Sequence, residues 1–195
     1  MSYLKWPVLI LAISILSINT LWGDDDEEEQ YENRSKNGTV TKLNTRYDFA
    51  VVTNSQFKAE CTSCHMAYLP GMLPARSWTK MMDTLNDHFG ENAELDVKVK
   101  NEITDFLTKN SSDKVHTKRG DKILATINPK ETVLRISSTE YFKRKHDEIS
   151  PNIYKRKSIG SPANCLACHG GAERGDFSED SVLIPKDKTP TIMKK

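Results

Sequence analysis

The chain has 195 residues, enough for one ordinary domain or two small ones. Hydrophobic residues make up 37% and charged residues 28% of the sequence, and 28 basic residues nearly balance 27 acidic ones, for a net charge of +1. This composition is typical of a globular protein and excludes a collagen-like or low-complexity chain. A charge so close to zero gives no indication of nucleic-acid binding.

The N-terminal segment is typical of a targeting sequence. Lys5 precedes an apolar run from Trp6 to Trp22, and a polar break follows. The cleavage site is poor, and a run of this length is at the lower limit for spanning a bilayer, so a retained anchor is the alternative to a cleaved signal. We expect residues 1–23 to export the chain and the acidic segment 24–46 to be a disordered linker.

All four cysteines lie in two copies of the pentapeptide Cys-x-x-Cys-His. The first copy is Cys61–His65, with Cys64 as its second cysteine, and the second is Cys165–His169, with Cys168. Cysteines three residues apart on a helical turn face nearly the same side, so both thiols can add to the vinyl groups of one haem. The adjacent histidine then offers its imidazole to the iron, which makes this pattern a c-type haem attachment motif.

Zinc binding and disulfide formation are the alternatives for these cysteines. A zinc site of four cysteines would join pairs that lie 104 residues apart. Two disulfides would suit an exported chain. Neither alternative requires the two following histidines, so we favour covalent haem at both motifs.

Two further histidines are candidates for the remaining iron ligands. A helix beginning at Ser77 and ending at Gly90 would place His88 on its apolar face. A second helix, starting from a capping box at Ser137 to Glu140, would carry Phe142, His146 and Ile149 on one side. Met72 is the competing ligand at the first haem, and His116 falls in a polar segment typical of the surface.

The remaining pattern predicts a mainly α protein with two small haem domains. The first domain spans 47–112 and includes a helix over about 94–107. The second spans 113–190 and includes two short strands, 123–127 and 132–136, before the second haem motif; residues 191–195 form a tail. Between Asp113 and Ile159 there are 12 basic and 6 acidic residues, a local net charge of +6.

Longer stretches around both motifs resemble one family. The first stretch runs from Cys61 to Trp78 as Cys-x-x-Cys-His-Met-x-Tyr-x-Pro-x-Met-Leu-Pro-x-Arg-Ser-Trp, and His88-Phe89-Gly90 follows. Later stretches are Phe142-x-x-x-His146-Asp147-Glu148-Ile149, the segment Ser161–His169, Ala172–Phe177 and Ile184-Pro185. Over residues 47–186 the chain resembles the bacterial dihaem cytochromes c that donate electrons to a small monohaem oxygen-binding cytochrome.

The resemblance implies a fold and a ligand set. It implies an N-terminal domain similar to class I cytochromes c and a C-terminal domain with its own fold. It also implies two histidine ligands for each iron, pairing His65 with His88 and His169 with His146.

The resemblance further implies an electron carrier rather than an enzyme. The expected partners are redox proteins, among them the monohaem cytochrome and a membrane cytochrome b. We expect a periplasmic protein that contacts the membrane only through a retained N-terminal segment and binds no nucleic acid. The alternative is a haem enzyme or gas sensor with one open iron site, for which the sequence offers no separate catalytic constellation.

Overall fold

A computed structural model describes residues 48–49 and 52–187. In this part of the chain the regular structure is helical, and no strand forms; two isolated β-bridges occur, His88 with Glu91 and His169 with Val182. The α-helices are α1 (Ser55–Cys61), α2 (Ala75–Asp83), α3 (Val97–Lys109), α4 (Lys118–Leu124), α5 (Glu140–Lys145) and α6 (Pro151–Tyr154). The 3-10 helices are η1 (Pro70–Met72), η2 (Leu85–Asp87), η3 (Ile136–Ser138), η4 (Cys165–Ala167), η5 (Ala172–Arg174) and η6 (Glu179–Ser181).

The mainly α prediction is confirmed, but the two predicted strands are wrong. Residues 123–127 contain the end of α4 and the turn after it, and residues 132–136 run without a strand partner into η3. The Thr117 hydroxyl caps α4 by accepting a hydrogen bond from the Gly120 amide, 3.1 Å away. Ile123 and Ile127 are both buried at a spacing of four, which is a helical rather than a strand period.

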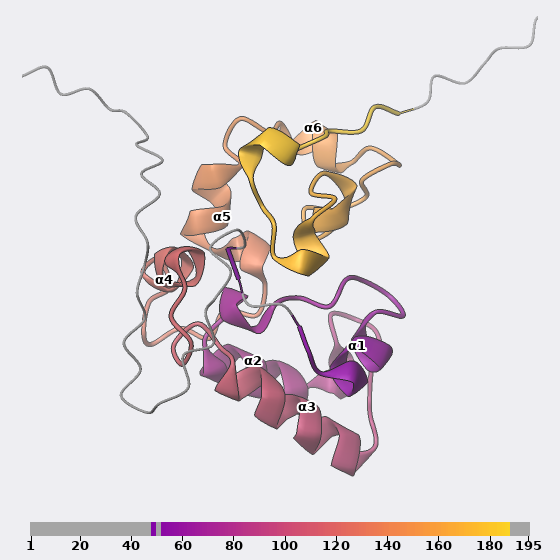
Figure 1. The fold of residues 1–195 in the computed structure, drawn as a ribbon. Helices are drawn as coiled ribbons and strands as arrows, with labels where there is room; N and C mark the ends of the chain where they lie inside the picture. The colour runs from indigo at the N-terminus through magenta and orange to yellow at the C-terminus, as the bar shows by residue number, and fades with distance from the viewer. Residues whose placement is uncertain (1–47, 50–51, 188–195) are drawn as a thin grey trace, which may run out of the picture. The chain divides into compact units, whose positions relative to one another are not determined.

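The helices of the first half form a packed pair. α2 and α3 lie side by side (Figure 1), with Trp78 and Met82 of α2 and Ile103 and Leu107 of α3 buried. Asp96 caps α3 through the Lys98 amide, so this helix begins and ends about two residues later than predicted.

The predicted helix from Ser77 to Gly90 is shorter in the structure. Its N-cap position is held by Pro74, and Ser77 is buried inside the helix. The α-helix ends at Asp83, where the Thr84 hydroxyl donates to the Lys80 carbonyl oxygen, 3.0 Å away, and the single turn η2 follows. His88 therefore lies in a loop beyond the helix and not on its apolar face.

The predicted helix through Phe142, His146 and Ile149 forms only as far as Lys145, and it has a different cap. Thr139, rather than Ser137, accepts the hydrogen bond from the Phe142 amide, at 3.1 Å. Because α5 ends at Lys145, His146 is the C-cap residue of the helix.

The main hydrophobic core draws on both halves of the sequence. Among the described residues, one cluster joins Phe49, Leu69 and Trp78 to Ile123 and Tyr141. The division into domains at 112/113 stays a prediction. The predicted targeting segment 1–23, acidic linker 24–46 and tail 191–195 lie outside the described residues. Within the described part, no helix combines the length and apolarity that a membrane crossing requires.

Candidate haem-binding site

The two cysteine motifs lie on different local structures. Cys61 is the last residue of α1, and Cys64 and His65 follow in a turn. The α1 helix is fixed at its start by Asn54, whose side chain accepts from the Phe57 amide at 2.6 Å. In the second motif, η4 begins at Cys165, and the amide of His169 donates to the Cys165 carbonyl oxygen at 2.8 Å.

At the first motif, His65 faces His88. Their ring centroids are 6.0 Å apart, and the ring planes are inclined by 30°. Metal–imidazole bonds are about 2 Å long and each ring centre lies roughly 1 Å behind its ligating nitrogen, so two axial imidazoles on one metal have centroids roughly 6 Å apart. The spacing fits a metal ion between the two rings.

At the second motif, His169 faces His146 in the same way. The centroids are 6.1 Å apart, but the ring planes are nearly perpendicular, at 77°. Phe142 stacks on His146 with a centroid distance of 4.0 Å, so the helical spacing of four fixes the orientation of this imidazole. The predicted ligands are thus brought together as two separate pairs.

Hydrogen bonds fix the tautomer of two of these imidazoles. Nδ1 of His65 donates to the Met66 carbonyl oxygen at 2.7 Å, and Nδ1 of His146 donates to that of Phe142 at 2.9 Å. Because a carbonyl oxygen only accepts, each Nδ1 carries the proton and each Nε2 keeps a free lone pair. Nδ1 of His169 is buried without a hydrogen-bond partner.

The loop that presents His88 is tight and locally strained. The His88 amide donates to the Glu91 carbonyl oxygen at 2.7 Å, and Asp87 Oδ1 accepts from the Gly90 amide at 3.0 Å. Phe89, between them, has φ 60°, a conformation that costs free energy for a residue other than glycine. The guanidinium of Arg135 lies 3.7 Å from the centre of the Phe89 ring and holds it from the other half of the sequence.

Burial favours the neutral forms of two of the ligand candidates and of two of the attaching thiols. It lowers the pKa of His88 and His169, with further lowering by the facing histidines. It raises the pKa of both Cys61 and Cys165 to about 11. Among the described residues, no three His, Cys, Asp or Glu side chains lie together as a zinc site requires, and the four cysteines form no disulfide, so neither alternative is favoured.

Three residues that follow the first motif have partners within the protein. Arg76 donates to the carbonyl oxygens of Glu131 and Asn128, at 2.7 and 3.1 Å, and Trp78 donates to that of Pro70 at 2.8 Å. Met72, the competing ligand, is buried in the hydrophobic core. His116 is exposed, as predicted.

Arg119 lies near the second site without having been predicted there. It forms an ion pair with Asp48 at 2.8 Å and donates to the Tyr141 hydroxyl at 2.9 Å, while its Nε is buried without a partner. Its positive charge adds to the lowering of the His169 pKa. A lone arginine in a polar segment gives no sequence signal for this position.

Comparisons with known proteins point to one family. The family model described as dihaem cytochrome c matches residues 57–177. A solved structure, the diheme cytochrome c from Rhodobacter sphaeroides, is 45% identical, with a TM-score of 0.59; the match covers 66% of this chain and 99% of that one. The diheme cytochrome type c from Shewanella baltica OS155 is 34% identical, with a TM-score of 0.57, over 70% of this chain and 97% of that one. A comparison with curated proteins found no match.

The matched region contains both cysteine motifs and both facing histidines. The paired rings, the available Nε2 atoms and the thiols fit the cofactors that the family carries, two c-type haems with their irons. The chain belongs to the dihaem cytochrome c family.

Proposed function

We propose that this protein is an electron carrier in which each of two covalently attached haems has two histidine ligands. The observation that carries the proposal is the pairing of each motif histidine with one other imidazole, at 6.0 and 6.1 Å. An iron with two histidine ligands has no position left for a substrate. This favours electron transfer over a peroxidase-like enzyme or a gas sensor with an open iron.

The protein's part in this function is to hold, orient and enclose the cofactors. Bound haem supplies an iron that takes up and releases one electron. The attaching cysteines are Cys61, Cys64, Cys165 and Cys168, and the proposed iron ligands are His65, His88, His146 and His169. Two histidine ligands favour a lower reduction potential of the iron than a methionine–histidine pair does, because thioether ligation raises the reduction potential.

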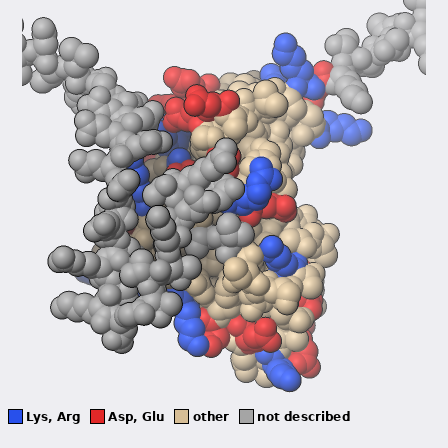
Figure 2. All heavy atoms as spheres, in the orientation of Figure 1, with Lys and Arg blue, Asp and Glu red and all other residues tan. Residues whose placement is uncertain are grey.

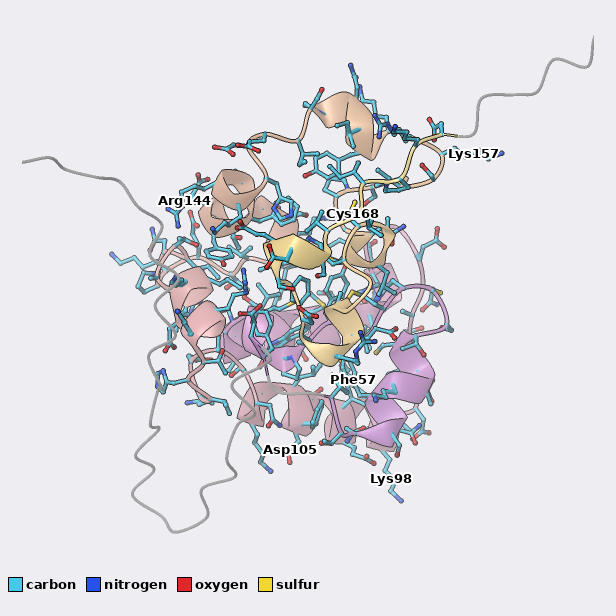
Figure 3. All side chains as sticks on the ribbon, turned by 45° about the horizontal axis from the view of Figure 1, so that its top comes forward. Phe57, Lys98, Asp105, Arg144, Lys157 and Cys168 are labelled. Atoms are coloured by element: carbon cyan, nitrogen blue, oxygen red, sulfur yellow. The ribbon has the colours of Figure 1, made fainter. Side chains whose placement is uncertain are left out.

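The proposed docking face carries the surplus positive charge of the second half. It consists of the runs 143–145 and 155–157, and Figure 3 shows Arg144 and Lys157 on outer segments, away from Cys168. Lys143 and Lys145 pair with Glu140 and Glu179 at 2.6 and 3.2 Å, so part of this charge is compensated. Figure 2 shows basic and acidic side chains interspersed on the face in view. An acidic redox protein fits the basic side chains of these two runs.

The location and the partners belong to the same proposal. The apolar N-terminal run supports export, so we place the protein in the periplasm, either free or anchored by that run. We propose a small monohaem oxygen-binding cytochrome as electron acceptor and a membrane cytochrome b as electron donor, because the resemblance of the sequence implies both.

The experiment that tests the proposal is carbon monoxide binding to the holoprotein. We expect two haems per chain, with low-spin visible spectra in both redox states that carbon monoxide leaves unchanged. His88→Ala and His146→Ala should each open one haem to carbon monoxide. His116→Ala is the matched control, because this histidine is exposed and pairs with Asp121.

Two results would contradict the proposal. Rapid carbon monoxide binding to the wild-type protein would mean an open iron and would favour catalysis or sensing. If both histidine variants stayed inert to carbon monoxide, the assigned ligands would be wrong.

A further inference from the structure

The side chain of Tyr68 joins the two haem-binding segments. Its ring lies 5.2 Å from that of His65, measured between centroids. Its hydroxyl donates a hydrogen bond to the carbonyl oxygen of Ala163, 2.5 Å away and 95 residues further along the chain. Ala163 precedes Cys165 by two residues, so a single side chain spans from the first motif histidine to the second attachment segment.

The acceptor carbonyl is itself close to the second attachment point. Cys165 Sγ lies 3.7 Å from the Ala163 carbonyl oxygen. Once that sulfur is bonded to haem it has no proton to donate, so the Tyr68 hydroxyl and the Cys165 amide, 3.0 Å away, remain as donors to this carbonyl. The oxygen would lose this hydrogen bond if the hydroxyl were removed.

The phenol stays protonated and keeps its place. Burial, with a smaller contribution from Cys165 and against the opposing effect of Arg135, raises the pKa of Tyr68 to about 12. Leu69 and Pro70, which follow it, are fully or almost fully buried, so the backbone beneath the ring is packed. The Tyr68 hydroxyl is therefore protonated and its backbone is packed, so it can hold the Ala163 carbonyl oxygen in a fixed position.

We propose that Tyr68 is a positioning residue that holds the second haem-attachment segment against the first and thereby sets the placement of the two haems relative to each other. The proposal rests on the proposed function, because it assumes haem at both motifs. Electron transfer between cofactors depends steeply on their separation, so a fixed placement matters to a carrier with two of them. The hydroxyl, rather than the ring alone, is the group that makes this connection.

The test compares Tyr68→Phe with wild-type holoprotein. Phenylalanine keeps the ring next to His65 and removes only the donor. Losing a hydrogen bond to a partly buried carbonyl should increase local opening of the second segment by about tenfold. The readout is amide hydrogen exchange at Ala167, Cys168 and His169, whose amides bond within that segment.

A second readout reports on the haems themselves. Two haems held close together interact in the Soret region of the circular dichroism spectrum, and the interaction depends on their relative orientation. Tyr68→Phe should change this signal while the absorption spectra and the inertness to carbon monoxide stay as in the wild type. General destabilisation alone would leave the native Soret signal unchanged.

Tyr141→Phe is the matched control. The Tyr141 hydroxyl is also hydrogen-bonded, accepting from Arg119, but both residues belong to the second half of the sequence. We expect lower overall stability without a selective increase in exchange at residues 167–169. Equal exchange rates and equal Soret signals in Tyr68→Phe and wild type would overturn the positioning role. Carbon monoxide binding to the wild type would instead overturn the proposed function, so the two failures are distinguishable.

Discussion

Asp113 stabilises α2 from a distant point in the sequence. Pro74, at the N-cap of that helix, has no side chain that can accept a hydrogen bond. The Asp113 carboxylate takes this role, accepting from the Ala75 amide at 2.8 Å and from the Ser111 hydroxyl at 2.7 Å. Partial burial raises the pKa of Asp113, but these two hydrogen bonds and the nearby Lys114 outweigh burial and lower it overall.

We therefore predict that Asp113→Ala destabilises the holoprotein. The loss of an N-cap acceptor costs about 0.5–2 kcal/mol. The Ser111 hydroxyl keeps a second partner, the Thr108 carbonyl oxygen at 2.8 Å, so the loss of its hydrogen bond to Asp113 adds little to the destabilisation. Urea unfolding followed by circular dichroism at pH 7 should show a decrease of about 1–2 kcal/mol in the free energy of unfolding.

The pH dependence gives a second check on the same carboxylate. Since its folded pKa lies below the ordinary value of 3.8, the stabilisation is fully present above that pH and is lost as the pH falls through the folded pKa. The difference in the free energy of unfolding between wild type and Asp113→Asn should be constant above about pH 5 and should decrease toward zero below about pH 4. Asp105→Asn is the control, because its exposed pair with Lys109 contributes only about 0.3–0.5 kcal/mol. An Asp113→Ala variant no less stable than this control would refute the reasoning.

Three further predictions concern the haem sites, the core and the docking face. The ring planes differ, 30° against 77°, so the ferric protein should give two distinct low-spin paramagnetic resonance signals, with the more anisotropic one from the second site; one shared signal would contradict the geometry. Trp78→Phe should lower the free energy of unfolding by about 1–3 kcal/mol, because the Pro70 carbonyl oxygen loses the indole donor at 2.8 Å and keeps the more distant Leu73 amide at 3.4 Å; an unchanged urea midpoint would argue against this. Electron transfer to an acidic partner should slow as ionic strength rises, and a rate independent of salt would exclude the proposed docking.

The haem sites are the part of this molecule that local sequence predicts best. Each attachment motif is complete within five residues, so its chemistry needs no knowledge of the fold. The structure brings the two predicted partner histidines to these motifs. For His146 the predicted reason holds in part, since α5 ends at Lys145 but the spacing of four still stacks His146 on Phe142.

For His88 the residue agrees with the prediction but the predicted reason does not. Its apolar spacing from Trp78 predicted one continuous helix, whereas the α-helix ends at Asp83 and a strained loop presents the imidazole. That loop depends on Arg135, 47 residues further along, stacking on Phe89. No local pattern contains such a contact.

The predicted strands failed for a related reason. Residues 123–127 and 132–136 contain the β-branched residues typical of strands, but a strand needs a paired neighbour. In the structure, the segment after α4 instead supplies backbone carbonyls to Arg76, from Asn128 and Glu131. The residue types indicate which conformation is favoured locally. The conformation that forms here is the one that hydrogen-bonds to Arg76 in the first half of the chain.

Each haem-binding site is linked to a charged residue that the other half of the sequence supplies. Arg135 of the second half stacks on Phe89 beside His88 and lowers the pKa of that histidine. Asp48 of the first half pairs with Arg119, whose charge acts on His169. Together with the shared hydrophobic core and the Tyr68 hydrogen bond, these contacts make the halves mutually dependent. It follows that neither half, expressed alone, would reproduce the environment that its own haem has in the whole chain.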